Sequence, residues 1–320
     1  SGVLGQRTGR IHLLVSEFGM GKAQVTKRFA EMAARKNKAT RTIHIRCPER
    51  AGNYALWDVL LRSLFDIPSN ADARSAGEQL MVGVARYLPE EAREVTTRIA
   101  DLTGYIVPGL GDSNRSEEDE TMEGSSIAAL VRLIRAVAKD PLLLVIAQAN
   151  QSSLASLNVL NALSSNLNDR PILIILAGTP GLRDLVPGWN KLGITKLGPL
   201  SKKVATETVQ LLLTGLKSPP IELTERIVER AQGSPWAIKS LLHYLGEAGA
   251  ISVEQGQYTL DESICWDLEW PEDFEGVVLA RLNTLTPRVR DVLGNAAVVG
   301  KVFWMGSLVA LERESVRMRN

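Results

Sequence analysis

The stretch "IHLLVSEFGMGKAQVTKRFAEMAARK", residues 11–36, joins an apolar run, a loop with two glycines and a helical pattern. An apolar run followed by residues of helical period predicts a strand, a loop and a helix in that order. The loop "SEFGMGKA", residues 16–23, therefore lies where phosphate-binding loops lie, between a strand and the helix that follows it. Whether it is a nucleotide site or the relic of one depends on which parts of the motif it keeps.

The loop matches the phosphate-binding motif only in part. That motif reads Gly, four residues, Gly-Lys and then Ser or Thr, and Gly21 and Lys22 match its centre with Gly19 as a further glycine. Glycines let backbone amides turn toward phosphates, and the lysine bridges the outer phosphates. Ser16 replaces the first glycine and Ala23 replaces the hydroxyl residue that would hold Mg²⁺. A tight turn that merely uses two glycines is the alternative. We expect the nucleotide-contacting residues to be Ser16, Gly19, Met20, Gly21, Lys22, Ala23 and Gln24.

A second motif that should supply acids is also altered. In nucleotide-hydrolysing enzymes with a phosphate-binding loop, a buried strand ends in Asp, which is often followed by a second acidic residue. The first carboxylate orients Mg²⁺, and the second polarises the attacking water. The candidate strand "LLLVI" ends in Ala147-Gln148, so neither position carries a carboxylate. Two independent magnesium contacts are therefore absent together. We expect ATP or ADP as the ligand, no magnesium site and no efficient hydrolysis, and we assign no catalytic residue.

Strands and helices alternate through the first 200 residues. The continuously apolar runs are typical of parallel strands that are covered on both faces. This order predicts an α/β fold with a doubly wound parallel sheet. The expected strands are 10–15, 40–47, 142–147, 170–179 and an edge strand at 194–200; helices are expected at 22–36, 53–67 and within 75–105, and an exposed, mobile loop at 107–126.

The pattern changes to helices after Ser201. Helical stretches at 202–216, 221–232 and 234–251 precede a hairpin at 251–260, and 274–311 is helical with a proline break. We therefore expect three domains. They are a nucleotide-binding domain (1–200), a helical lid (201–250) and a winged-helix-like region (251–320) that is truncated relative to a longer protein.

Composition excludes several classes of protein. The 320 residues carry a net charge of +1, which gives no global attraction to nucleic acid or to anionic membrane. The longest apolar run, near residues 141–149, is too short to span a bilayer, which takes about 20 residues. Cys47 and Cys265 fit no disulfide framework or zinc spacing and are expected to be reduced thiols. We therefore expect a cytoplasmic protein with no membrane contact.

Six short segments together resemble one family. In each pair below, the segment of this chain comes first and the family's typical segment second. In the first 200 residues, "SEFGMGKA" matches "GEAGIGKS", "LVIAQANQSS" matches "LVLDDLHWAD" and "RPILIILAGT" matches "RPLLLLAT". Further along, "LGPLSKKV" matches "LGPLSEEE", "GSPWAIKSLLHYLGEAGAI" matches "GNPFFLEELVRALVESGAL", and "VLARLNTLTPRVRDVLGNAAVVGKVF" matches "LLARLDRLSPEARELLQAAAVLGREF". In these segments the chain resembles the STAND-class P-loop ATPases, signal-transduction relatives of AAA+ proteins found in large bacterial regulators. The likeness covers nearly all of the chain in the right order.

The resemblance implies roles for further residues. The family's Gly-x-Pro motif matches Gly233-Ser234-Pro235, which implies that Pro235 contacts adenine. The same triplet reads as a helix start, with Ser234 as the cap and Pro235 as the first helical residue. Arg183 lies near the position of the family's phosphate sensor, although an exposed helix residue is the alternative.

The resemblance implies a degenerate ATPase module with a regulatory or scaffolding role in signalling. Its expected partners are proteins, either further copies of itself or an active ATPase paralogue. One alternative is a slow but genuine ATP-driven switch in which Glu17 or a partner's residue supplies the missing groups. Another is a DNA-binding transcription regulator acting through its C-terminal region, against which the near-neutral charge argues. Ala23 and Gln148 are also residues that could be introduced deliberately to trap ATP, whereas Ser16 and "QANQ" favour natural divergence.

Overall fold

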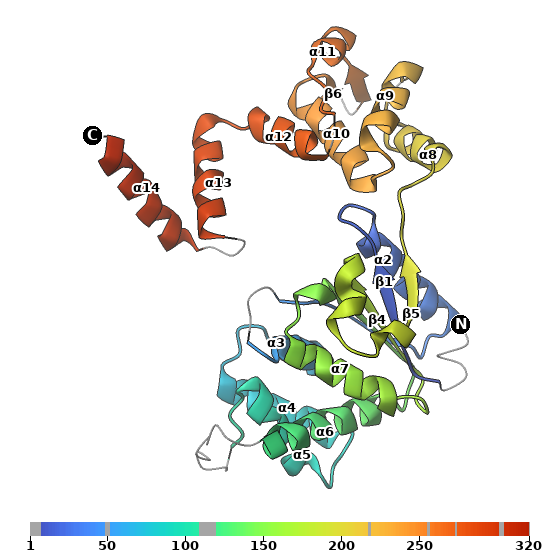
Figure 1. Cartoon of the computed structure of the whole chain (residues 1–320), viewed down its shortest axis with the longest axis vertical. Helices are drawn as coiled ribbons and strands as arrows, with labels where there is room; N and C mark the ends of the chain where they lie inside the picture. The colour runs from blue at the N-terminus through green and yellow to red at the C-terminus, as the bar shows by residue number, and fades with distance from the viewer. Residues whose placement is uncertain are drawn as a thin grey trace. The chain divides into compact units, whose positions relative to one another are not determined.

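The computed structural model describes residues 8–48, 52–108, 120–216, 219–254, 257–272, 274–300 and 304–319. The chain divides into two compact units (Figure 1). The first unit comprises Ser1–Phe18 and Lys22–Leu197, and the second comprises Gly19–Gly21 and Gly198–Asn320. The division into three domains expected from the sequence stays a prediction.

The first unit is built on a parallel sheet. Its five strands have the order β2-β3-β4-β1-β5, so the first strand in the sequence lies inside the sheet. Every neighbouring pair is parallel. The prediction of an α/β fold with a parallel sheet is therefore confirmed. The strands are β1 (Arg10–Val15), β2 (Arg41–Arg46), β3 (Leu142–Ala147), β4 (Ile172–Gly178) and β5 (Gly193–Lys196).

Helices follow the strands and cover both faces of the sheet. They are α2 (Lys22–Lys36), α3 (Ala55–Phe65), α4 (Ala73–Ala85), α5 (Ala92–Thr103), α6 (Glu120–Val137) and α7 (Leu154–Asn166), with 3₁₀ turns η1 (Ala149–Gln151), η2 (Pro180–Leu185) and η3 (Trp189–Lys191). The helical region expected over 75–105 is therefore the pair α4 and α5.

The loop expected over 107–126 is wrong at its C-terminal end. Residues 109–119 lie outside the described residues, but α6 already begins at Glu120. Helix formation is cooperative, so the strongly helical pattern after residue 126 extends backward. Acidic residues such as Glu120 and Glu123 also suit the positive end of a helix. These effects outweigh the Gly and Ser residues of this stretch.

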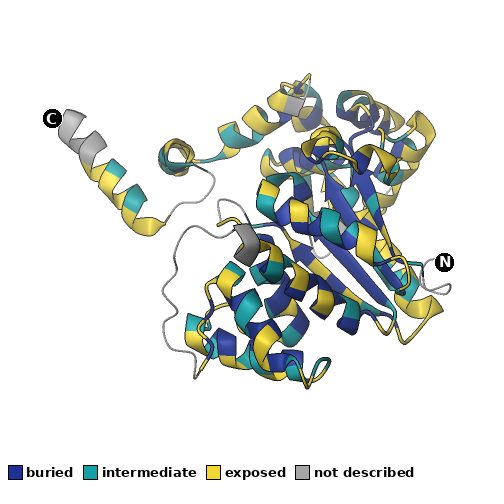
Figure 2. Cartoon of the chain, turned by 60° about the horizontal axis from the view of Figure 1, so that its bottom comes forward, coloured by how far each residue is buried: buried dark blue, intermediate teal, exposed yellow. Residues whose placement is uncertain are grey.

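Two hydrophobic clusters lie on opposite faces of the sheet. The larger cluster packs one set of strand side chains, among them Leu13 and Ile146, against α3 to α7. The smaller one packs Leu14 and Val145 against Ala30 and Ala33 of α2. Figure 2 shows the strands in the middle of the sheet as mostly buried, which are β1, β3 and β4. One face is thus covered by several helices and the other by α2, through small side chains.

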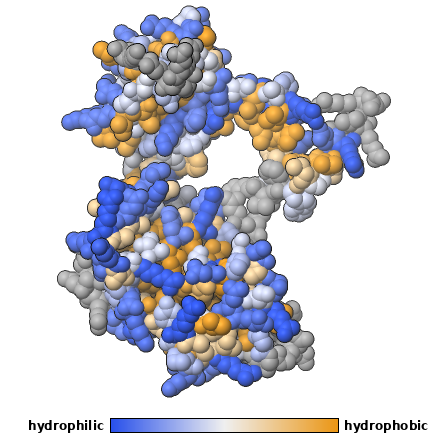
Figure 3. Space-filling view, turned by 180° about the vertical axis from the view of Figure 1, so that it is seen from behind, coloured by the Kyte–Doolittle hydropathy of each residue, from blue (hydrophilic) through white to orange (hydrophobic). Residues whose placement is uncertain are grey.

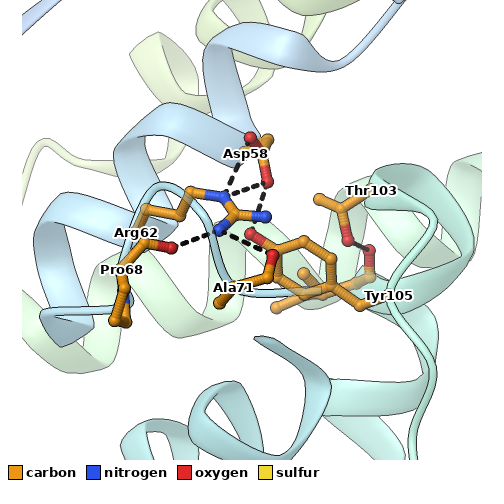
Figure 4. Close-up of polar contacts among 7 residues, drawn as sticks. Asp58, Arg62, Pro68, Ala71, Thr103 and Tyr105 are labelled. Carbon is orange, nitrogen blue, oxygen red and sulfur yellow. Dashed lines mark hydrogen bonds and ion pairs between the residues drawn. The ribbon is translucent and has the colours of Figure 1, made fainter. Parts of the chain in front are cut away.

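A polar cluster fixes the segment that follows α5 (Figure 4). Arg62 forms an ion pair with Asp58 at 3.0 Å and donates to the carbonyl of Pro68 at 2.6 Å. The Tyr105 hydroxyl donates to Asp58, and the Arg62 guanidinium lies 5.4 Å from the centre of the Tyr105 ring. Burial is the main cause that raises the pKa of Tyr105, and the hydrogen bond to Asp58 raises it further. The phenol therefore stays protonated and remains a hydrogen-bond donor. The cluster therefore ties the chain after α5 to α3.

The second unit is mainly helical. Its elements are α8 (Lys202–Leu212), α9 (Ile221–Ala231), α10 (Pro235–Glu247), the antiparallel hairpin β6 (Ile251–Glu254) and β7 (Gln257–Leu260), α11 (Glu262–Asp267), α12 (Phe274–Thr284), α13 (Pro287–Val299) and α14 (Met305–Arg319). One buried cluster joins residues of α8 to α12, among them Leu241, Cys265 and Trp270. The expected hairpin and the break at Pro287 are both present, whereas the short helix α11 was not expected.

Candidate functional site

The loop after β1 has the backbone that a phosphate-binding loop needs. Gly19 and Gly21 have φ angles of 81° and 88°, in the left-handed region that favours glycine. Ser16 is buried, and its amide donates to the carbonyl of Gly178 at the end of β4, at 3.2 Å. The start of the loop is therefore anchored to the carboxyl edge of the sheet, where α/β folds bind ligands.

The lysine of the motif is held at the base of the loop. Lys22 Nζ donates to the carbonyl of Ser16 at 2.8 Å, to Ser16 Oγ at 2.7 Å and to the carbonyl of Glu17 at 2.9 Å. These three acceptors match the three donors of an ammonium group. Burial lowers the pKa of Lys22, and the charge of Glu17 acts in the opposite direction. An incoming phosphate would have to replace at least one of these acceptors.

The first turn of α2 carries no acidic side chain. The helix begins at Lys22, and α4, α7, α8 and α10 likewise have no acidic residue in their first turns. Free amides and the helix dipole at such an end attract anions. Together with Lys22 and the glycines, this end of α2 is suited to a phosphate group.

The two positions that would serve magnesium carry other groups. Ala23 is exposed and offers no side-chain oxygen. The nearest hydroxyl along the helix, Thr26 Oγ1, is buried and donates to the carbonyl of Ala23 at 3.0 Å. Ala147 ends β3, and Gln148 takes a left-handed conformation with φ 56°. Within the described part of the chain, no group of three or more His, Cys, Asp or Glu could hold a metal ion.

A cation faces the position of the missing acid. Arg46 ends β2, in register with Ala147, and its Nε donates to Gln148 Oε1. The sequence reasoning missed Arg46. The signal was available, because the carboxyl ends of neighbouring parallel strands meet at one edge of the sheet. A positive side chain therefore lies beside Gln148, at the carboxyl end of β3.

Other polar side chains of this unit have hydrogen-bond partners within the chain. Asn150 Oδ1 accepts from the amide of Thr179 at 3.3 Å. The Cys47 thiol lies 2.9 Å from Ser152 Oγ, and burial raises the pKa of that thiol. Arg183 donates to the carbonyl of Asn190 at 2.8 Å, which holds η2 to η3. A phosphate contact by Arg183 stays a prediction.

The predicted site residues divide between the two units. Ser16, Lys22, Ala23 and Gln24 belong to the first unit, whereas Gly19, Met20, Gly21 and Pro235 belong to the second. Gln24 is exposed and Met20 is half-buried.

Pro235 is the first residue of α10. Ser234 caps that helix, because its Oγ accepts from the amide of Ala237 at 3.2 Å. The capping role of the triplet is confirmed. An adenine contact by Pro235 stays a prediction.

No helix among the described residues is long and apolar enough to cross a membrane. No protein-family profile matches the sequence, and no curated protein matches it.

Solved structures match the chain at low identity. The ORC1 protein of Aeropyrum pernix in complex with DNA is 14% identical over 98% of this chain and 73% of its own, with a TM-score of 0.45. A chain of the HORMA:CdnC:Trip13 complex of E. coli MS115-1 is 11% identical over 88% of this chain and 75% of its own, with a TM-score of 0.43. A chain of Drosophila ORC bound to DNA is 16% identical over 76% of this chain and 53% of its own, with a TM-score of 0.36. The parallel sheet with helices on both faces gives this chain an α/β fold, in which the glycine loop follows β1.

Proposed function

We propose that this chain is an AAA+-like nucleotide-binding module that holds ATP or ADP with little or no hydrolysis. In this proposal it is a degenerate member of the STAND type and has a regulatory or scaffolding role in signalling. The observation that carries the proposal is the contrast between the two halves of the site. The phosphate half keeps Lys22 and the left-handed glycines, whereas the magnesium half holds Ala23, Ala147 and Gln148.

The phosphate half fits a nucleotide. The positive φ of Gly19 and Gly21 turns the loop as a phosphate cradle requires, and Lys22 already lies at its base. A phosphate oxygen would take the place of the loop oxygens that Lys22 now bonds. A bound ATP supplies three phosphates for these groups, and the side chains present would bind and orient them.

The magnesium half does not fit a metal-dependent hydrolase. Arg46 donates to Gln148 at the end of β3, so a cation already occupies this edge of the sheet. An additional divalent cation beside a guanidinium, without a carboxylate, is electrostatically unfavourable. Gln148 can orient a water molecule but is a poor base. We therefore expect nucleotide affinity that depends little on magnesium.

Lys22→Met tests the phosphate half. Loss of a charge-assisted hydrogen bond of about 1.5–3 kcal/mol should weaken ADP binding by roughly one to two orders of magnitude. Lys27→Met is the matched control, because Lys27 is an exposed lysine on the same helix. Calorimetric titration of ADP into each protein, with Mg²⁺ and with EDTA, gives the affinities. Equal affinity of the wild type and Lys22→Met, or no binding by either, would refute the proposal.

ATP turnover distinguishes the proposal from a slow switch. We expect no phosphate release above background from the wild type with Mg²⁺. Steady release that is lost in Lys22→Met and kept in Lys27→Met would instead establish a genuine ATPase. Release that is lost in Lys22→Met but kept in Lys27→Met excludes a contaminating phosphatase, because the two variants are purified in the same way.

A regulatory module of this kind needs a protein partner. In this proposal it acts in the cytoplasm beside further copies of itself or an active ATPase paralogue. Light scattering of the purified chain with and without ADP measures self-association. A strict monomer under both conditions would leave the paralogue as the partner to be tested by co-purification.

A further inference from the structure

The first unit has an apolar groove on the face of the sheet that α2 covers. The groove has a volume of about 680 Å³ and lies where α2, β1, β4 and β5 meet. Its apolar lining residues include Leu14, Val25, Phe29, Leu173, Ile175 and Leu192. Seen from behind in Figure 3, hydrophobic residues gather in the middle of the sheet-containing unit, with hydrophilic residues around them.

The groove exists because α2 covers this face incompletely. The helix packs on the sheet through Ala30 and Ala33, and among its residues only Thr26 is buried. Parallel sheets normally have both faces covered by helices, because their strands are apolar on both sides. The face beside α2 therefore has room for one more apolar element.

The larger apolar side chains of α2 remain exposed. Val25, Phe29 and Met32 are 43%, 38% and 57% exposed, and Val25 and Phe29 line the groove. Their spacing of four and then three residues places them on one stripe of the helix, over about two turns. Such a stripe, next to a groove, is the surface that a second amphipathic helix packs against.

The charged residues of this surface are mostly positive. Among the described residues, the charged side chains that line the groove are Arg10 and Lys191, and both are cations. His12 also lines it, bonds to Thr195 Oγ1 at 2.8 Å and has its pKa lowered by burial, which favours the neutral ring. Along α2, five cations (Lys22, Lys27, Arg28, Arg35 and Lys36) stand against one acid, Glu31, which pairs with Arg28.

We propose that this groove binds an amphipathic helix of a partner protein that carries acidic residues beside its apolar stripe. The apolar stripe would cover Val25 and Phe29, and the acidic residues would face Arg10 and Lys191. A helix fits because the surface consists of a helix stripe and an adjacent sheet face, and acidic flanks fit because the rim is basic. The proposal goes beyond nucleotide binding and does not depend on it.

Two synthetic helical peptides of identical apolar pattern test the proposal, one with Glu and one with Lys at the polar positions. Fluorescence anisotropy with the whole chain should show that the Glu peptide binds roughly tenfold or more tightly than the Lys peptide, and that added salt weakens it. Phe29→Asp should abolish this binding. Leu211→Asp is the matched control, because Leu211 is 71% exposed on α8 of the other unit.

A charge-reversal variant keeps the proposal testable even if Phe29→Asp misfolds. Lys191→Glu keeps the apolar surface and should weaken the Glu peptide while strengthening the Lys peptide. Equal binding of both peptides, binding unchanged in Phe29→Asp, or no binding of either would overturn the proposal. Self-association that Phe29→Asp removes would also overturn it, because a second copy would then occupy the groove. Retained ADP binding by Phe29→Asp separates this result from a failure of the nucleotide site.

Discussion

Replacing Gly77 by alanine should disrupt the contact between α4 and the segment Tyr105–Val107. A Cβ atom at Gly77 would lie 2.1 Å from the carbonyl oxygen of Ile106 and 2.8 Å from its carbonyl carbon. The segment cannot move freely, because the Ile106 amide donates to the carbonyl of Ala73 at 2.9 Å and the Tyr105 hydroxyl donates to Asp58 (Figure 4). The clash therefore involves backbone that is held on both sides.

The cost follows from this geometry. Ordinary contact begins at 3.4 Å, so the segment must move by about 1.3 Å, the difference between 3.4 and 2.1 Å. Overpacking of this kind costs about 1–3 kcal/mol, and losing the Ile106–Ala73 hydrogen bond costs about 1 kcal/mol more. The higher helix propensity of alanine stabilises the folded variant by about 1 kcal/mol. The expected net loss in the free energy of unfolding is therefore about 1–3 kcal/mol.

Gly124→Ala is the matched control within the same unit. Gly124 lies in α6, and a Cβ there has no heavy atom within 4 Å. The same substitution should therefore stabilise by up to about 1 kcal/mol. Urea unfolding followed by tryptophan fluorescence gives the stabilities, and hydrogen exchange of α4 peptides assigns the change to the first unit. A midpoint for Gly77→Ala that equals or exceeds that of Gly124→Ala would refute the reasoning.

Three further predictions concern side chains of the first unit that are buried or half-buried. Burial lowers the pKa of His12 below its ordinary 6.5, so the unfolded chain binds the proton more readily than the folded chain. The contribution of His12 to the free energy of unfolding should therefore be complete above pH 6.5 and decrease as the pH falls below it. His12→Asn should reduce this decrease, as measured by urea unfolding at several pH values. Burial raises the pKa of Cys47, so iodoacetamide should alkylate this thiol far more slowly than a free thiol, as followed by mass spectrometry. Ser152→Ala removes a hydrogen bond that lowers the pKa of Cys47, so alkylation should become slower still. Faster alkylation in that variant would contradict the argument. Trp57 is fully buried and its Nε1 donates to the carbonyl of Ser156 at 3.2 Å, so Trp57→Phe should cost about 2 kcal/mol in urea unfolding, and an unchanged midpoint would disprove that contribution.

Local patterns were sufficient to predict most elements of the sheet unit. The helix over 22–36 and the strand over 142–147 have the predicted bounds, because continuous apolar runs and helical periodicity are set by neighbouring residues. The end of the loop near Glu120 was predicted wrongly, because composition alone outweighed the cooperative extension of α6.

The amino-acid sequence by itself determined the glycine loop, its lysine and the alternation of strands and helices. The tertiary structure decided which strands are neighbours, and it thereby brought Arg46 to Gln148 across 102 positions of the chain. It also decided that α2 packs through alanines, which leaves Val25 and Phe29 beside an open groove. Periodicity reports which face of one element is apolar, but the partner of that face is chosen by the packing of segments that are distant in the chain.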